Sequence, residues 1–238
     1  MLTALTAQNT RAVTAIFDVT PEFVARQIDT VFEDIRIDAV KIGMLSNAAI
    51  VEAVADRLGH WKPRWIVLDP VMVAKSGDRL LDPTAVEALR TRLLPLADLI
   101  TPNLPEAAVL LGEEPIRERA RMGNVAARLQ GLGAKNVLLK GGHLDAGESP
   151  DLLLHGGELY WLESERVETK NTHGTGCTLS SAVAAFLARR HPLPEAVALA
   201  KRYLTGALRH ADELDVGHGH GPVHHFWHFW PQLEGWQP

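Results

Sequence analysis

The sequence predicts an α/β fold in which helices cover both faces of a mostly parallel sheet. Short apolar runs alternate along the chain with longer segments of helical periodicity, which is the order expected of strand–helix–strand units. Polar residues and glycines gather where the apolar runs end, while the runs themselves stay apolar. The 238 residues, 46% of them hydrophobic, suffice for one domain spanning 1–238 with its own core.

Each element of this fold follows from a local pattern. The predicted buried strands are Asp38–Gly43, Arg64–Asp69, Ala97–Thr101 and Asn136–Lys140. The predicted helices are Pro21–Phe32, Asn47–Leu58, Pro83–Leu93, Arg117–Leu132 and Leu193–Leu214. Asp151–Trp161 interrupts the alternation and predicts an antiparallel hairpin that turns at Gly156 and Gly157.

Composition excludes several classes of function. A formal net charge of −5, with scattered lysines and arginines, argues against a broad nucleic-acid surface. No apolar run reaches the length needed to cross a membrane. The single cysteine cannot form an internal disulfide, which suits a reducing compartment. We therefore expect a cytoplasmic protein that binds neither nucleic acid nor a membrane.

The segment Asn171–Ser180 is a glycine-rich loop that runs into the apolar sequence of a helix. The first turn of a helix presents unpaired backbone N–H groups and partial positive charge, and its natural occupant is an anion such as phosphate. Gly174, Thr175, Gly176 and Cys177 are thus candidates for holding a phosphoryl group during its transfer. The alternative is a glycine-rich turn that merely begins a helix.

Cys177, the only cysteine, lies within this loop. As an activated thiol it could accept a proton from an attacking hydroxyl group. As a structural residue it would be a small hydrophobic side chain.

Asn103 and Glu106 follow a predicted strand and lie three residues apart at the start of a helix. Oxygen ligands of this kind suit Mg²⁺, usually through water and substrate phosphates. The same spacing is that of a capping box, which is the favoured interpretation from spacing alone and does not exclude the other.

Other strand ends carry less specific signals. The glycines of Lys140–His143 either let the backbone approach a nucleotide closely or form a tight turn. Lys75–Gly77 is either a mobile lid or an ordinary polar loop. Gln8 could recognise a heteroaromatic ring through paired hydrogen bonds, although a strand-ending turn is favoured. Met44 could line an apolar pocket, although core packing is the usual role of methionine.

Six of the eleven histidines lie between His210 and His228. No cysteine or carboxylate with zinc-site spacing accompanies them. The pattern favours a histidine-rich surface tail over a metal site, and its aromatic residues 226–230 are expected to pack on the domain or on another subunit.

Together and in this order, the motifs resemble the hydroxymethylpyrimidine/phosphomethylpyrimidine kinases of thiamine biosynthesis, in the ribokinase-like superfamily. The resemblance covers essentially the whole chain. Its segments are Thr3–Thr10, Lys41–Met44, Leu68–Met72, Lys75–Gly77, Ile100–Ala107, Lys140–His143, Asn171–Ser180 and Gly221–His224.

The resemblance implies a three-layer αβα sandwich and two ATP-dependent reactions. The first phosphorylates 4-amino-5-hydroxymethyl-2-methylpyrimidine, and the second converts the monophosphate to the diphosphate. It implies that Gln8 and Met44 contact the pyrimidine, and that Gly174, Thr175, Gly176 and Cys177 form the anion hole. It further implies that Asn103 and Glu106 organise Mg²⁺ through water, that Lys140 and His173 lie near the nucleotide, and that the enzyme is a homodimer.

One departure from the family pattern concerns the beginning of the chain. Family members begin with a strand, a glycine-rich segment and a helix, whereas this sequence starts at what would be their second strand. A missing interior strand leaves backbone groups unpaired. We therefore expect the chain as written to be unstable or weakly active unless another segment or subunit fills the gap. The alternatives in function are a pyridoxal-type kinase and a weakly active nucleotide-binding remnant.

Overall fold

The computed structural model describes residues 1–72, 83–144 and 149–230. Its main sheet has six strands in the order β3-β4-β5-β6-β7-β8. These strands are Val40–Ile42, Ile66–Leu68, Leu99–Ile100, Val137–Lys140, Asp151–His155 and Glu158–Leu162. The first four run parallel, and β7 and β8 are antiparallel to their neighbours. The carboxyl ends of β3 to β6 therefore meet at one edge of the sheet.

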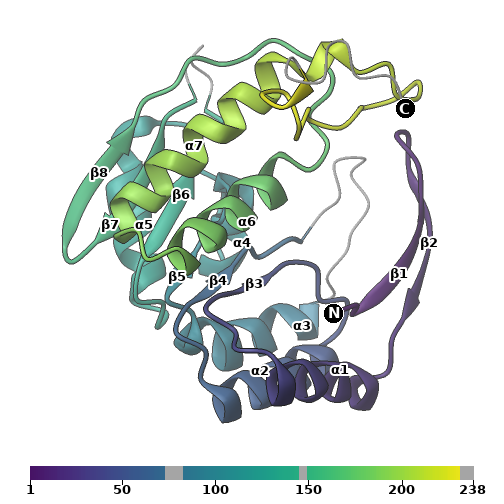
Figure 1. Cartoon of the computed structure of the whole chain (residues 1–238). Helices are drawn as coiled ribbons and strands as arrows, with labels where there is room; N and C mark the ends of the chain where they lie inside the picture. Colours follow the sequence, from purple (N-terminus) through teal and green to yellow (C-terminus); the bar gives the residue numbers. More distant parts are fainter. Residues whose placement is uncertain (73–82, 145–148, 231–238) are drawn as a thin grey trace.

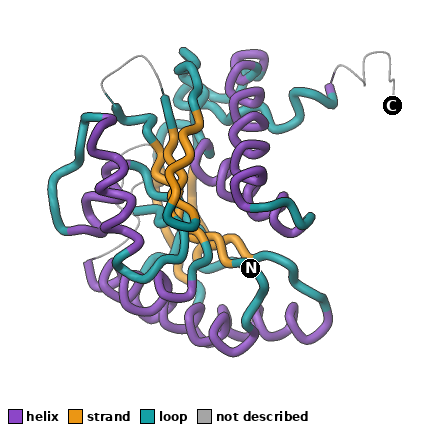
Figure 2. Tube along the Cα trace, turned by 90° about the vertical axis from the view of Figure 1, so that its left-hand side faces the viewer, coloured by secondary structure: helices purple, strands orange, loops and turns teal. Residues whose placement is uncertain are grey.

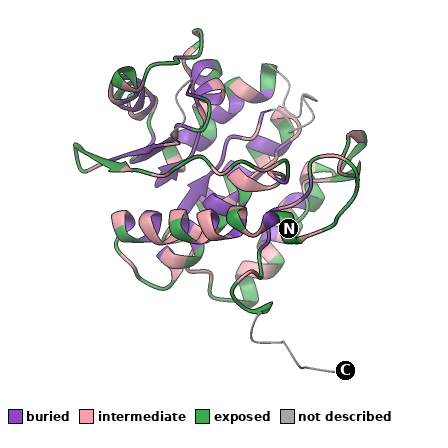
Figure 3. Cartoon of the chain, turned by 90° about the horizontal axis from the view of Figure 1, so that it is seen from above, coloured by how far each residue is buried: buried purple, intermediate pink, exposed green. Residues whose placement is uncertain are grey.

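Alternating side chains in the strands divide the core into two layers. In β4, Ile66 and Leu68 pack into one hydrophobic cluster, and Val67 packs into the other. The first cluster contains residues of α1, α2, α3, α4 and α5, and the second contains residues of α6 and α7. Figure 2 shows the strands running between helices on either side, and Figure 3 shows buried residues concentrated where sheet and helices meet. This arrangement confirms the predicted αβα sandwich with a mostly parallel sheet.

The helices agree with the predicted ones in position, with shifted ends. They are α1 (Pro21–Asp34), α2 (Ala48–Trp61), α3 (Pro83–Ala88), α4 (Leu104–Leu111), α5 (Met122–Gln130), α6 (Thr175–Ala188) and α7 (Leu193–Arg209). The predicted helix Pro83–Leu93 is α3 followed by a π-helical turn, Leu89–Leu93. The predicted helix Arg117–Leu132 is shorter, because only a 3₁₀ turn at Arg119–Arg121 precedes α5. The predicted helix Leu193–Leu214 ends at Arg209, and a 3₁₀ turn at Ala211–Glu213 follows it.

A second, two-stranded sheet stands apart from the main one (Figure 1). It consists of β1 (Ala4–Gln8) and β2 (Val13–Asp18), paired antiparallel. Its tip contacts the C-terminal segment, since the backbone N–H of His220 donates to the carbonyl oxygen of Thr10 at 2.9 Å. The sequence predicted a turn at the end of a strand near Gln8, but not the hairpin.

Strand β3 is at the edge of the main sheet, and among the described residues no strand pairs with its outer side. The segment Lys75–Gly77 lies outside the described residues.

Candidate active site

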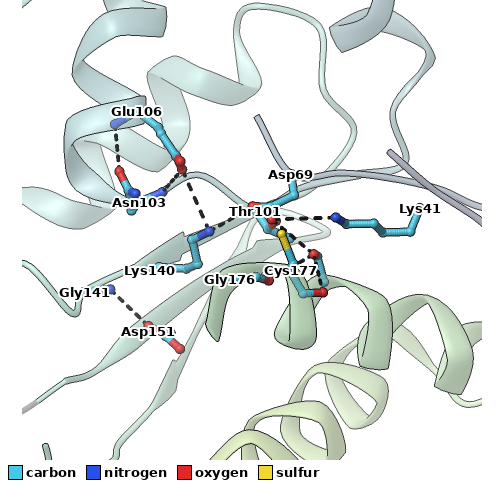
Figure 4. Close-up of polar contacts among 11 residues, drawn as sticks. Lys41, Asp69, Thr101, Asn103, Glu106, Lys140, Gly141, Asp151, Gly176 and Cys177 are labelled. Atoms are coloured by element: carbon cyan, nitrogen blue, oxygen red, sulfur yellow. Dashed lines mark hydrogen bonds and ion pairs between the residues drawn. The ribbon is translucent and has the colours of Figure 1, made fainter. Parts of the chain in front are cut away.

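The candidate site lies where the carboxyl ends of β4, β5 and β6 face the start of α6 (Figure 4). The segment that follows β5 stays paired with the end of β6, because the N–H of Lys140 donates to the carbonyl oxygen of Pro102 at 2.9 Å. A parallel bridge joins Asn103 to Lys140. The sheet itself thus places the Asn103–Glu106 pair beside Lys140, which belongs to a different sequence motif.

Asn103 and Glu106 form the capping box that their spacing favoured. The Asn103 side chain accepts from the Glu106 N–H at 2.8 Å, and Glu106 Oε2 accepts from the Asn103 N–H at 2.7 Å. Asn103 therefore has a structural role at the start of α4. Because only one carboxylate oxygen of Glu106 is bound in this way, the box leaves the other available to a cation or its water shell.

Asp69 is the centre of the polar network, although no sequence motif marks it as a site residue. It follows β4 and is 1% exposed. The Lys140 ammonium lies 2.9 Å from Asp69 Oδ1 and 3.8 Å from Glu106 Oε2. Lys41 approaches Asp69 from the opposite side in Figure 4, with its Nζ 4.0 Å from Oδ2.

The pKa shifts in this cluster follow from burial and from its two carboxylates. Burial raises the pKa of Glu106 to about 7, against the lowering effect of the Lys140 charge. Burial alone would lower the pKa of Lys140, but Asp69 and Glu106 outweigh it, and the net pKa is raised. Lys140 is therefore positively charged at neutral pH, and Glu106 takes up a proton more readily than an exposed carboxylate does.

The start of α6 has the form expected of an anion-binding turn. Gly174 is its N-cap, with a left-handed φ of 80°, and no side chain caps the helix. By contrast, Thr20, Asn47 and Asn103 cap α1, α2 and α4. The first-turn N–H groups of Gly176 and Cys177 therefore lack both a helical partner and a cap.

The Lys140 ammonium borders this turn. A Cβ atom added at Gly176 would lie 3.1 Å from Lys140 Nζ and 3.6 Å from Asp69 Oδ2. Gly176 thus lets a positive charge approach the backbone of the anion loop. Cys177, in the same turn, is a free and exposed thiol.

The other candidates lie farther from this network. Gln8 and His173 line a recess between the β1–β2 tip and the loop before α6, together with His220. Met44 is half-buried after β3, and its carbonyl oxygen accepts from the Thr3 hydroxyl at 2.8 Å. Thr3 directly precedes β1 and Gln8 ends it, so no contact among the described residues brings Met44 and Gln8 together.

The Lys140–His143 segment is a tight turn whose first glycine is required by packing. A Cβ atom at Gly141 would lie 1.9 Å from the Pro150 carbonyl oxygen, and the Gly141 N–H donates to Asp151 Oδ1 at 3.0 Å. Lys201 on α7 anchors Asp151, with Nζ 2.6 Å from Oδ2. Gly141 is therefore explained by this packing without a nucleotide.

The histidine-rich segment is only partly a surface tail. His224 is 1% exposed, and its backbone N–H donates to the Ala207 carbonyl oxygen at 3.0 Å. Trp227 stacks on His210, with ring centroids 5.2 Å apart. The prediction that the tail lies on the surface is wrong for His224, because the aromatic residues pack this segment onto α7. Among the described residues no cluster of three or more histidine, cysteine or acidic side chains could hold a metal ion.

Comparison with known proteins identifies the family. The phosphomethylpyrimidine kinase family model matches residues 1–224. The chain belongs to this family. It is 52% identical to the hydroxymethylpyrimidine/phosphomethylpyrimidine kinase of Escherichia coli, over 97% of this chain and 86% of that protein. It is 54% identical to the thiamine biosynthesis bifunctional protein ThiED of Geobacter sulfurreducens, of which it spans 45%.

Solved structures agree with this assignment. The phosphomethylpyrimidine kinase of Clostridium difficile superposes with a TM-score of 0.77 at 43% identity, covering 87% of this chain and 84% of that one. The pyridoxal kinase of Staphylococcus aureus, in complex with AMP-PCP and pyridoxal, superposes with a TM-score of 0.86 at 30% identity, covering 96% and 82%. The fold is therefore ribokinase-like, and the chain is a kinase. None of the helices in the described ranges is long and apolar enough to cross a membrane.

Proposed function

We propose that this kinase transfers the γ-phosphoryl group of ATP to 4-amino-5-hydroxymethyl-2-methylpyrimidine, and then to the monophosphate to give the diphosphate for thiamine biosynthesis. The observation that carries the proposal is the Lys140 ammonium, which lies 2.9 Å from Asp69 and beside Gly176 of an uncapped helix start. Positive charge and unpaired N–H groups converge there, as transfer of a phosphoryl group requires.

Each candidate residue has a role in this proposal. Gly174, Thr175, Gly176 and Cys177 form the anion hole, in which the unpaired N–H groups of Gly176 and Cys177 receive the transferring group and Lys140 balances its charge. The hydroxymethyl oxygen bonds to the γ-phosphorus as the bond to the β-phosphate oxygen breaks. Cys177 either accepts the hydroxyl proton or gives polar support. Gln8 and Met44 bind the pyrimidine, and His173 lies at the nucleotide side.

ATP use is supported by relatives solved with ADP and with AMP-PCP. Mg²⁺ fits the chemistry of Glu106, an oxygen ligand whose burial raises its pKa to about 7 and which a cation would favour in ionised form. Asn103 and Glu106 would hold it through water, and it would neutralise charge on the ATP phosphates. We place the enzyme in the cytoplasm, where Cys177 stays a free thiol.

An assay of ADP release with the two pyrimidine acceptors tests the proposal. With Mg²⁺ and ATP, we expect turnover of the hydroxymethylpyrimidine and of its monophosphate, with the diphosphate identified by mass. Pyridoxal is the competing acceptor, because the pyridoxal kinase of Staphylococcus aureus superposes with a TM-score of 0.86. Preferred turnover of pyridoxal, or ATP binding without transfer to either pyrimidine, would contradict the proposal.

We also propose that the chain forms a homodimer through the β1–β2 hairpin. Leu5 and Phe17 are directly paired across its strands and are 50% and 71% exposed. An isolated two-stranded hairpin is at best marginally stable in water. A second subunit covering these side chains would both bury them and hold the hairpin.

A further inference from the structure

Asp69 joins four elements through a single carboxylate. Oδ1 accepts from the Thr101 hydroxyl at 3.1 Å, at the end of β5, and binds Lys140 at 2.9 Å, at the end of β6. Oδ2 lies 3.2 Å from the hydroxyl of Ser180 on α6 and 4.0 Å from Nζ of Lys41 on β3. The carboxylate thus connects the sheet edge with the helix that carries the anion loop.

Ser180 extends this connection to the anion loop itself. It is fully buried, and its Oγ lies 3.0 Å from the Gly176 carbonyl oxygen and 3.2 Å from that of Cys177. The Ser180 hydroxyl has one proton, so it donates a hydrogen bond either to Asp69 or to one of these carbonyl oxygens at a time. The position of the first turn of α6 is therefore coupled to Asp69 through a buried hydroxyl.

Asp69 itself cannot bind substrate, because its side chain is 2% exposed and its oxygens already face these donors. Any effect on the reaction must pass through the groups that it holds. The most direct is Lys140, whose Nζ is 3.1 Å from where a Gly176 side chain would begin.

We propose that Asp69 is a positioning residue for phosphoryl transfer: it fixes the Lys140 ammonium beside Gly176 and aligns the first turn of α6 with it through Ser180. The proposal rests on the proposed function of this site. Without the carboxylate, Lys140 keeps the Glu106 carboxylate, at 3.8 Å, and the electrostatic attraction of Asp151, but it loses its 2.9 Å ion pair. The ammonium would then be free to leave the anion loop.

Asp98 provides a matched control on the opposite edge of the sheet. It precedes β5, is 8% exposed, and pairs with Lys135 at 2.6 Å. It also accepts from the Ile66 N–H at 2.8 Å. Asp98→Asn therefore removes a largely buried, ion-paired carboxylate of the same sheet without touching the candidate site.

The experiment compares kinetics and stability of Asp69→Asn and Asp98→Asn. We expect both to lower the melting temperature. Only Asp69→Asn should lower kcat, by roughly a hundredfold, the scale of losing one preorganised charge-stabilising group, with a much smaller change in the KM of the pyrimidine. An equal fall in kcat for both variants, or a change below about twofold in Asp69→Asn, would overturn the proposal, since a transition-state group must move kcat.

A double-mutant cycle identifies the route of the effect. If Asp69 acts through Lys140, then Asp69→Asn combined with Lys140→Met should lose little more than Lys140→Met alone. If the losses in kcat of the two single variants multiply in the double variant, Asp69 does not act through Lys140. Should Asp69→Asn fail to fold, Ser180→Ala keeps the proposal testable: we expect about a tenfold lower kcat, and an unchanged kcat refutes the coupling to α6.

The two proposals fail in different ways. If the wild-type protein phosphorylates neither pyrimidine, the proposed function is wrong. The kcat for ADP release, with pyridoxal or water as the acceptor, still tests Asp69: a fall in Asp69→Asn but not in Asp98→Asn supports it, and equal kcat values in all three proteins contradict it.

Discussion

Cys177 is the residue whose contribution should depend on the acceptor. An alcohol must lose a proton as its oxygen bonds to phosphorus, whereas a phosphate monoester, with a second pKa of about 6, is largely deprotonated at neutral pH. We predict that Cys177→Ala lowers kcat for the hydroxymethylpyrimidine by roughly a hundredfold, the scale of a lost general base, and much less for the monophosphate. Equal losses would assign Cys177 to polar support. Ser181→Ala, an exposed position on the same helix, is the control.

Glu106 makes stability depend on pH. Its pKa is raised from 4.5 to about 7 in the folded protein. Between these values the native state holds a proton that the unfolded state has released, so stability falls as pH rises, by at most about 1.4 kcal/mol per pH unit. In Mg²⁺-free urea titrations from pH 5 to 8, we expect this fall in the wild type and a flatter dependence in Glu106→Gln. Parallel curves for the two proteins would refute it.

Two helical glycines should respond in opposite ways to alanine. A Cβ atom at Gly206 on α7 would lie 2.3 Å from the Trp227 ring, whereas one at Gly59 on α2 meets nothing within 4 Å. We predict that Gly206→Ala detaches the C-terminal segment and lowers the melting temperature. Gly59→Ala should stabilise the protein by about 0.5–1 kcal/mol, because alanine is the better helix former. Thermal unfolding measures both effects, and the difference in tryptophan fluorescence between each protein and its Trp227→Phe variant reports detachment.

At the scale of elements, what the sequence predicted depended on burial. The strands β4 and β6 are predicted correctly because their side chains are almost all buried and apolar. The β1–β2 hairpin was missed because nearly every residue in it is exposed, and no core-facing pattern marks it. The hairpin at Gly156 and Gly157 was recognised from its turn residues, both of which have positive φ.

The candidate site was predicted in parts. Lys140, Glu106 and Gly176 each stood out from local motifs, but their convergence depends on strand order. The sequence marks Asp69 only as the last residue of a predicted strand. Its partners Thr101, Lys140 and Ser180 are 32, 71 and 111 residues away. A polar residue directly after a fully buried strand was the one available signal.

At the scale of the whole molecule, the tip of the β1–β2 hairpin meets the C-terminal segment of the described chain. The hairpin tip is held by Thr10, whose hydroxyl accepts from the Gly219 N–H at 3.1 Å and whose carbonyl accepts from His220 at 2.9 Å. The C-terminal segment also pairs with the loop before α6, where the His173 N–H donates to the Gly221 carbonyl at 3.0 Å. The hairpin is therefore anchored at its tip, close to the anion loop, while Leu5 and Phe17 along its strands stay exposed.

This anchoring leads to the prediction for assembly. Because the tip is fixed and the strands are uncovered, a partner subunit would bind along the strands. We predict that the wild-type protein sediments as a dimer at micromolar concentration and that Phe17→Ser dissociates it. Val109→Ser, which replaces a 48% exposed side chain on α4 away from the hairpin, should leave the dimer intact. A monomeric wild type, or a Phe17→Ser dimer of unchanged stability, would show that the hairpin is not the interface.

Since Gln8 ends β1 next to the recess that His173 lines, dissociation should also raise the KM of the pyrimidine more than that of ATP.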